Sequence, residues 1–145
     1  MKVVINRCYG GFSLSPKGER RYLELKGHKS YFYKQTKYGF SHRETEFTRI
    51  DNIDDVPGIF FFCTTHDQGE FISDYPEDIF HCRELKRSDP ILVQVVEELG
   101  KESFGVCAEL KVIEIENGRW FKIDEYDGYE SIQYRDIDDE WILAE

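Results

Sequence analysis

The sequence predicts a small α+β domain with a mixed or antiparallel sheet, two helices and a C-terminal β-hairpin, all within one domain at 1–145. Three observations predict it. Short runs of β-branched and aromatic residues alternate with turn signals, and two segments carry helix start and stop signals. Asn117-Gly118 joins two apolar runs near the C-terminus, which is typical of a hairpin. A chain of 145 residues is long enough to bury one core.

The N-terminal segment reads as a strand, a glycine turn and a helix. Val3, Val4 and Ile5 form a continuous apolar run, which predicts a strand buried on both faces. Ser15-Pro16 predicts a helix start, with serine as the N-cap and proline at the first helical position. Glu19 falls in the first turn, where the helix dipole favours an acid. We expect this helix to end at Gly27.

The middle of the chain is rich in strand-forming residues. Aromatic and cationic residues mix over 29–49, and this composition predicts two strands around Tyr38-Gly39. Residues 59–63 predict a short buried strand, and 66–69 a turn. For 74–87 the sequence indicates one helical turn at most.

The last third contains the second helix and the hairpin. Asp89-Pro90 starts a helix with one apolar stripe, and Gly100 stops it. Pairing about Asn117-Gly118 places Ile115 opposite Trp120, and Val112 opposite Ile123.

Beyond that hairpin, the sequence predicts a turn and an apolar end. Asp127-Gly128 is the turn signal, and Trp141, Ile142 and Leu143 need a partner surface. Because the hairpin is apolar on both faces, the sequence also allows a homo-oligomer in which a second copy covers one face.

Composition and charge narrow the function classes. The formal net charge of −10 argues against binding duplex DNA with the whole surface. Cations dominate 1–49 and acids dominate 50–145, so the first part has room for a phosphate-bearing ligand. Alternatively, the two parts pack together, or pair between subunits, and their charges cancel. We expect no membrane span. The four cysteines form no CxxC pair, and no signal peptide precedes them, so we expect reduced thiols in a cytoplasm.

Two blocks of the chain resemble a family of small bacteriophage and prophage proteins. The blocks are KVVINRCYGGFSLS at the N-terminus, and DPILVQVVEELG with AELKVIEI and EYDGYESI in the last third. Together they cover about half of the chain, at 1–25 and 87–134. The segment 28–86 is then an insertion relative to the family. The resemblance implies a phage accessory protein that acts in the host cytoplasm, and it implies no particular reaction.

The glycine turn is the leading candidate site. Two glycines let the backbone approach a ligand closely, and the helix that follows offers free N–H groups. A guanidinium can bind a phosphate and aromatic rings can stack on a base. The ligand-binding residues expected on this basis are Arg7, Tyr9, Gly10, Gly11, Phe12, Ser13, Tyr31, Lys34 and Arg43. Neither a P-loop nor a dinucleotide fingerprint is present. The alternative is a purely structural turn, in which Asn6 and Arg7 satisfy nearby backbone groups.

Other clusters support weaker hypotheses. Cys8 would need a neighbouring base to act as a nucleophile, and small buried thiols are far commoner. Cys63-x-x-His66 with His81-Cys82 has ligand types that suit zinc, but the second pair is adjacent rather than spaced. The acidic cluster Asp136, Asp138, Asp139 and Glu140 reads as a solvated tail. We therefore assign no catalytic residue, no metal site and no cofactor from the sequence.

The function that the sequence favours is a non-enzymatic phage-type binder of a small phosphorylated or nucleotide ligand, such as a signal of host defence. The alternative is an acidic protein that binds and inhibits a host protein, in the manner of a nucleic-acid mimic. A thiol- or metal-dependent enzyme comes third.

Overall fold

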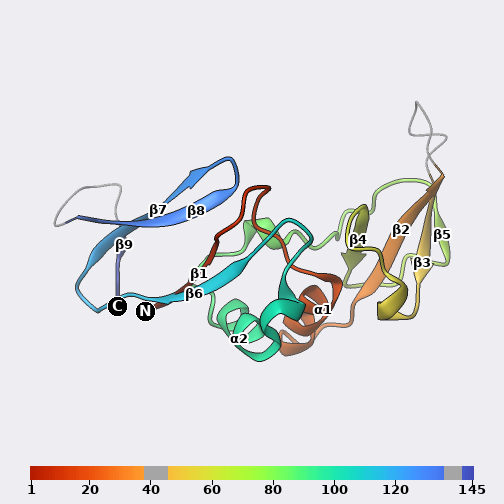
Figure 1. The fold of residues 1–145 in the computed structure, drawn as a ribbon. Helices are drawn as coiled ribbons and strands as arrows, with labels where there is room; N and C mark the ends of the chain where they lie inside the picture. Colours follow the sequence, from red (N-terminus) through yellow and green to blue (C-terminus); the bar gives the residue numbers. More distant parts are fainter. Residues whose placement is uncertain (38–45, 136–141) are drawn as a thin grey trace.

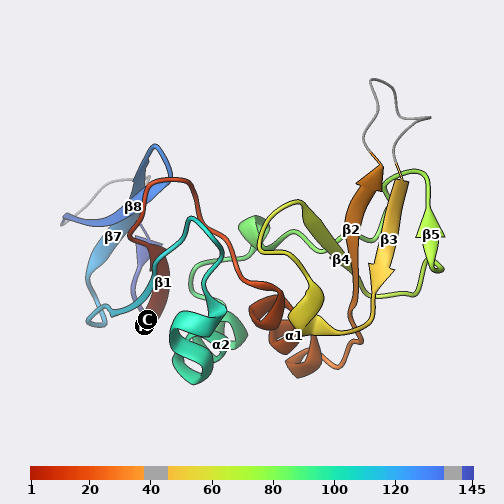
Figure 2. The ribbon, with the colours of Figure 1, turned by 45° about the vertical axis from the view of Figure 1, so that its right-hand side comes forward.

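A computed structural model of the chain describes residues 1–37, 46–135 and 142–145. Within these residues, helices and small antiparallel sheets are arranged in a row along an elongated molecule (Figure 1). The helices lie in the middle, and a sheet lies towards each end (Figures 1 and 2). The two termini lie side by side in both views. The predicted α+β class is confirmed.

The sheets are short, and every pairing is antiparallel. β1 (Lys2–Asn6) pairs with β6 (Leu110–Glu114). The second sheet has the order β4 (Phe61–Thr64), β2 (Tyr31–Lys37), β3 (Glu46–Ile50) and β5 (Phe71–Ile72). The third has the order β8 (Tyr129–Arg135), β7 (Trp120–Tyr126) and β9 (Ile142–Leu143). Short 3₁₀ turns are η2 (Ile53–Asp55), η3 (Cys82–Glu84) and η4 (Gly100–Ser103).

Both helices begin where their capping signals predict. In α1 (Pro16–Leu25) the Ser15 hydroxyl accepts a hydrogen bond from the Gly18 amide at 3.1 Å. In α2 (Pro90–Leu99) the Asp89 carboxylate accepts one from the Ile91 amide at 2.9 Å. Gly27 and Gly100 follow the two helix ends with positive φ angles.

β1 is buried on both faces, as its apolar run predicts. Val3, Val4 and Ile5 are each at most 1% exposed. Val4 belongs to the main core, which includes both helices. Val3 and Ile5 pack on the other side in a smaller cluster with Phe121 of β7. The strand therefore joins the helical middle of the molecule to the β7–β8–β9 sheet.

The predicted hairpin about Asn117-Gly118 is wrong. The turn itself forms, since the Arg119 amide donates to the Glu116 carbonyl at 3.2 Å. The flanking strands do not pair with each other, because β6 uses β1 as its partner while β7 pairs with β8 and β9. The C-terminal hairpin is instead β7–β8, about the predicted turn at Asp127-Gly128. Ile142 and Leu143 find their partner surface on β7.

The middle segment follows the prediction in part. β2 and β3 pair on either side of 38–45, which lie outside the described residues. The strand predicted at 59–63 begins only at Phe61, because Ile59 and Phe60 are 52% and 72% exposed and Phe60 has a φ of +56°. Across 74–87 the only helical element among the described residues is the turn η3. Among the described helices, none has the length and apolar character needed to cross a bilayer.

Candidate functional site

The Gly10-Gly11 turn packs directly against the turn of the β7–β8 hairpin. The Gly10 amide donates to the Asp127 carbonyl at 3.2 Å. A Cβ on Gly128 would lie 2.2 Å from the Gly11 nitrogen, so the two backbones touch. Both turn glycines have positive φ, at 120° and 101°. The Gly10 amide of the predicted ligand-binding turn therefore donates its hydrogen bond within the chain.

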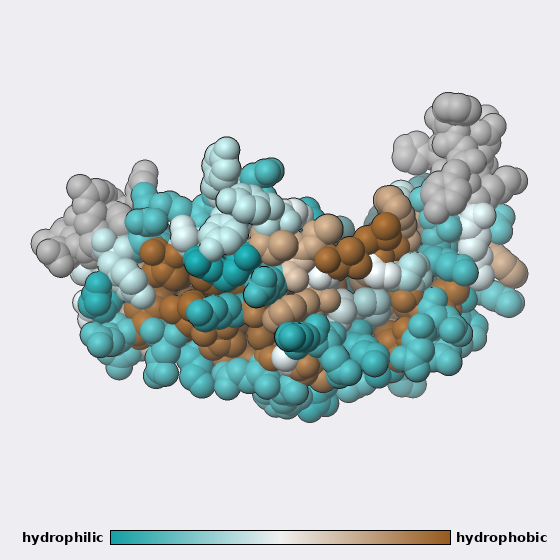
Figure 3. Space-filling model, in the orientation of Figure 1, coloured by the Kyte–Doolittle hydropathy of each residue, from teal (hydrophilic) through white to brown (hydrophobic). Residues whose placement is uncertain are grey.

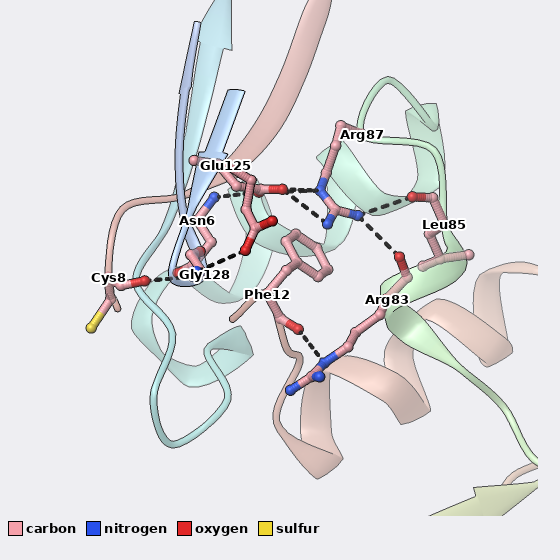
Figure 4. A network of polar contacts seen from close by, with 9 residues as sticks. Asn6, Cys8, Phe12, Arg83, Leu85, Arg87, Glu125 and Gly128 are labelled. Atoms are coloured by element: carbon pink, nitrogen blue, oxygen red, sulfur yellow. Dashed lines mark hydrogen bonds and ion pairs between the residues drawn. The ribbon is translucent and has the colours of Figure 1, made fainter. Parts of the chain in front are cut away.

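A buried asparagine holds this turn in place (Figure 4). The Asn6 amide group donates to the carbonyls of Cys8 and Gly128 at 2.8 and 2.7 Å. Its side-chain oxygen accepts from the Glu109 amide at 3.0 Å. Arg7 also reaches a backbone group, the Glu130 carbonyl, at 3.4 Å. These contacts match the structural alternative, in which Asn6 and Arg7 satisfy nearby backbone.

An ion pair beside the asparagine ties three segments together (Figure 4). Glu130 of β8 is 6% exposed and accepts from the Asn6 backbone amide at 2.9 Å. Its carboxylate also accepts from the Arg87 guanidinium at 3.1 to 3.3 Å. Arg87 in turn stacks over the Phe12 ring, 3.8 Å from the ring centroid. Phe12 is 4% exposed and belongs to the core, so it offers no stacking surface to a ligand.

The remaining predicted residues fall into separate places. Arg7 and Tyr9 both contact the Tyr129 ring. The Arg7 Cζ atom lies 4.6 Å from the ring centroid, and the centroids of the Tyr9 and Tyr129 rings are 5.3 Å apart. Arg7 and Tyr9 are both exposed on the turn. The Ser13 carbonyl accepts from the Gly105 amide at 3.0 Å.

The aromatic and basic residues of the middle segment do not join that group. Tyr31 and Lys34 lie on β2, in the sheet at the other end of the molecule (Figures 1 and 2). Arg43 lies outside the described residues, as do Asp136, Asp138, Asp139 and Glu140. The structure therefore groups the residues of 7–13 but separates them from β2.

A hollow of about 490 Å³ lies between α1, the β2–β3–β4 sheet and the segment 75–81, and we call it the Glu19 hollow. Its lining is mainly aromatic: Glu19, Gln35, Phe47, Phe60, Phe61, Phe62, Tyr75, Ile79, Phe80 and His81. Phe47, Phe62 and Tyr75 form a ring cluster with centroids 4.6 to 5.6 Å apart. Tyr75 and Phe60 remain 54% and 72% exposed, and apolar surface is visible near β4 in Figure 3.

Glu19 is the polar group inside this hollow that the sequence analysis missed. The sequence predicts it only as a favourable acid in the first turn of the helix, and in the structure it is just 6% exposed. The reason is its helix face: Tyr22 and Leu23 follow at three and four residues, and both are buried. That spacing from two apolar residues is the signal that could have placed the carboxyl inside.

The Glu19 carboxyl has weak hydrogen-bond partners. The Cys63 thiol donates to one carboxyl oxygen at 3.3 Å, and the Cys82 thiol also hydrogen-bonds to the carboxyl. Thiols are poor donors, so they compensate little for the lost water. Burial consequently raises the pKa of Glu19 to about 7. At neutral pH the group is poised between its acid and carboxylate forms.

The same burial makes the two thiols unreactive. Cys63 is fully buried and Cys82 is 8% exposed. Burial raises the pKa of the Cys63 thiol and raises that of Cys82 to about 11. Both therefore stay protonated at neutral pH, which disfavours a nucleophile or a thiolate metal ligand.

The four residues of the zinc hypothesis do not form one site. The Cys63 and Cys82 thiols both hydrogen-bond to the Glu19 carboxyl, whereas His66 contacts the Asp78 carboxylate at 3.2 Å. Across residues 1–37, 46–135 and 142–145, no group of three His, Cys, Asp or Glu side chains is arranged to hold a metal ion.

A histidine lines the hollow, and an arginine follows it two residues later beside the glycine turn. His81 lines the hollow and is exposed. Two residues further on, the exposed Arg83 donates to the Phe12 carbonyl at 3.1 Å and lies beside Gly11. Within the described part of the chain, Arg83 forms no ion pair with a carboxylate. The segment 80–83 thus runs from the hollow to the glycine turn.

Comparison with protein-family models, curated proteins and solved structures finds no match to this chain.

Proposed function

We propose that this chain is a non-enzymatic binding protein that captures a small nucleotide-type ligand, with the ring of the ligand in the Glu19 hollow. The observation that carries this proposal is the buried carboxyl of Glu19, beside aromatic rings, for which the described residues provide two thiols as side-chain partners. A buried polar group whose hydrogen-bond partners are weak calls for a stronger partner. A ligand with N–H groups would donate hydrogen bonds to the Glu19 carboxyl.

The size and lining of the hollow support this proposal. Small-molecule sites are usually about 300 to 1,000 Å³, mostly apolar, with a few polar groups that orient the ligand. The Glu19 hollow has about 490 Å³, and aromatic residues supply most of its wall. Flat rings stack on such walls, each stacked base contributing about 1–3 kcal/mol.

An arginine near the hollow in sequence, Arg83, supports the proposal that the ligand carries a phosphate. From Phe80 to Arg83 the chain spans at most about 10 Å, since each residue adds about 3.3–3.6 Å. This is the length scale of a mononucleotide, so a base in the hollow would bring its phosphate near the Arg83 guanidinium. An unpaired guanidinium suits a phosphate, which it can bind with two parallel hydrogen bonds.

The resemblance to phage proteins supports a proposal about where this function is carried out. We propose an accessory protein that acts in the host cytoplasm and sequesters its ligand. A sequestering protein needs affinity and no chemistry, and the two protonated thiols beside Glu19 agree with that.

A second candidate function is acid–base catalysis by Glu19. The observation that favours it is the pKa of about 7, which is the range of an efficient general acid or base. The two functions differ in outcome: a binder releases the nucleotide unchanged, whereas an enzyme converts it. Chromatography of nucleotides after incubation with the protein distinguishes them.

Isothermal titration calorimetry with a panel of nucleoside monophosphates tests the binding proposal. We expect saturable binding to the wild-type chain, weakened at least tenfold by Tyr75→Ala, which removes an exposed ring of the hollow. Phe71→Ala is the matched control, because Phe71 is 60% exposed on β5 but does not line the hollow. Absence of binding at millimolar nucleotide, or equal loss in both variants, would refute the proposal.

A further inference from the structure

Resting on the proposed function, we infer that the ligand is a guanine nucleotide, read by Glu19 through the two adjacent N–H donors of the guanine ring. These donors are the ring N1–H and the exocyclic 2-amino group. Adenine, cytosine and uracil do not present two adjacent donors on one edge. The inference therefore names the base that the hollow selects.

The hydrogen-bonding capacity of Glu19 matches this pair. An ionised carboxylate accepts about four hydrogen bonds at its two oxygens. The thiols of Cys63 and Cys82 are the side-chain partners that the described residues provide. Two acceptor positions remain, and two parallel N–H donors from one rigid ring satisfy both in a charge-assisted pair.

The walls of the hollow fit the shape of the base. Phe60, Phe61, Phe62 and Phe80 line it together with Tyr75, so a flat ring finds aromatic faces while its edge meets Glu19. Purines offer the larger stacking area of the two base classes. The shape of the hollow thus favours a purine. Among the purines, guanine is favoured because it donates two hydrogen bonds to the Glu19 carboxylate.

An arginine side chain from a partner protein presents the same paired donors on a flat group. The nearest cation argues against it, because the Arg83 guanidinium, two residues beyond His81 of the lining, repels a second cation. The same guanidinium attracts the phosphate of a nucleotide. The charge near the hollow therefore favours a nucleotide over an arginine side chain of a partner protein. Free arginine is included among the ligands of the test.

The sharpest test compares ligands that differ by one group. Calorimetry at pH 8, where Glu19 is ionised, measures the binding of guanosine, inosine and adenosine monophosphates, and of free arginine, to the wild-type chain. Inosine monophosphate lacks only the 2-amino group, and we expect it to bind about tenfold more weakly than the guanosine compound. Adenosine monophosphate turns an acceptor towards the carboxylate and should bind about 100-fold more weakly.

Variants assign the selectivity to Glu19. Glu19→Gln keeps the size of the side chain but places a donor against the 2-amino group, so we expect the three affinities to converge. Glu24→Gln removes an exposed carboxylate from the same helix and should leave the order unchanged. The ligand comparison on wild-type protein requires no variant, so it stands even if Glu19→Gln does not fold.

The outcomes distinguish a failure of the guanine inference alone from a failure of both proposals. Equal affinities for all nucleotides, still dependent on Tyr75, would overturn the guanine inference and leave the proposed function standing. Binding of free arginine but of no nucleotide would overturn both in favour of a protein partner. Binding of nothing in the panel would overturn both outright.

Discussion

Burial of Glu19 predicts an unusual pH dependence of stability, which Glu19→Gln should abolish. In the unfolded chain this carboxyl has its ordinary pKa of 4.5, and in the folded chain burial raises it to about 7. Below pH 4.5 both states hold the proton, so burial of the neutral acid carries no ionisation penalty. As the pH rises towards 7, only the unfolded state loses its proton, and the folded state becomes relatively less stable.

The size of the effect follows from the difference between the two pKa values. Each unit corresponds to 1.36 kcal/mol, so the wild-type chain should lose about 3 kcal/mol of stability between pH 4 and pH 8 relative to Glu19→Gln. For a chain of 145 residues this amounts to a difference of about 10 °C in Tm. The buried amide of the variant adds an offset of its own, but that offset does not change with pH.

Denaturant melts of both chains from pH 4 to pH 8 measure this difference, with Glu24→Gln as the control for loss of an exposed carboxylate from α1. The wild-type and Glu19→Gln curves should diverge between pH 4.5 and 7 and run parallel above it. Parallel curves across the whole range would show that Glu19 titrates as an ordinary exposed acid, and the account of the hollow would be wrong.

Three further predictions concern the hollow and the glycine turn. Nucleotide affinity should rise about tenfold per pH unit up to pH 7 and then level off, because only the ionised form of Glu19 accepts hydrogen bonds from both N–H donors of the ligand. Titration calorimetry at several pH values measures this dependence. An affinity that does not change with pH would count against a role of Glu19 in binding. Glu130→Ala leaves its partly buried arginine partner without a counter-charge and should reduce the free energy of unfolding by about 3 kcal/mol. Glu97→Ala, at an exposed ion pair, should change it by less than about 1 kcal/mol. Gly128→Ala should lower the free energy of unfolding by at least about 2 kcal/mol more than Gly118→Ala, as measured in denaturant melts. Both glycines have φ near +85°, but only a methyl group at Gly128 meets the backbone of the glycine turn. Equal losses of stability would show that the two turns do not touch.

Local signals in the sequence predicted the helices, because the position where a helix begins depends on capping residues that are adjacent in sequence. Ser15-Pro16 and Asp89-Pro90 each combine a capping side chain with a proline, and both helices begin there. The turn at Asn117-Gly118 also forms as its residues predict. Strand pairing is not local, and the partner of β6 lies more than 100 residues away at the N-terminus. A turn signal alone therefore cannot decide which strands pair.

The candidate site was harder to predict than the fold. The sequence directed attention to Gly10 and Gly11, where the glycines allow two turns to pack closely. The Glu19 hollow joins α1, the β2–β3–β4 sheet and the segment 75–81, and only the tertiary structure brings them together. Glu19 itself lies on a buried helix face, although it stands where a surface acid is normally found.

Carbon-13 NMR titration of the Glu19 carboxyl, in the free protein and with guanosine monophosphate present, tests the central claim most directly. The account predicts a midpoint near pH 7 in the free protein and a midpoint at least one unit lower with the nucleotide, because the N–H donors stabilise the carboxylate. A midpoint near 4.5 that the nucleotide does not shift would contradict it.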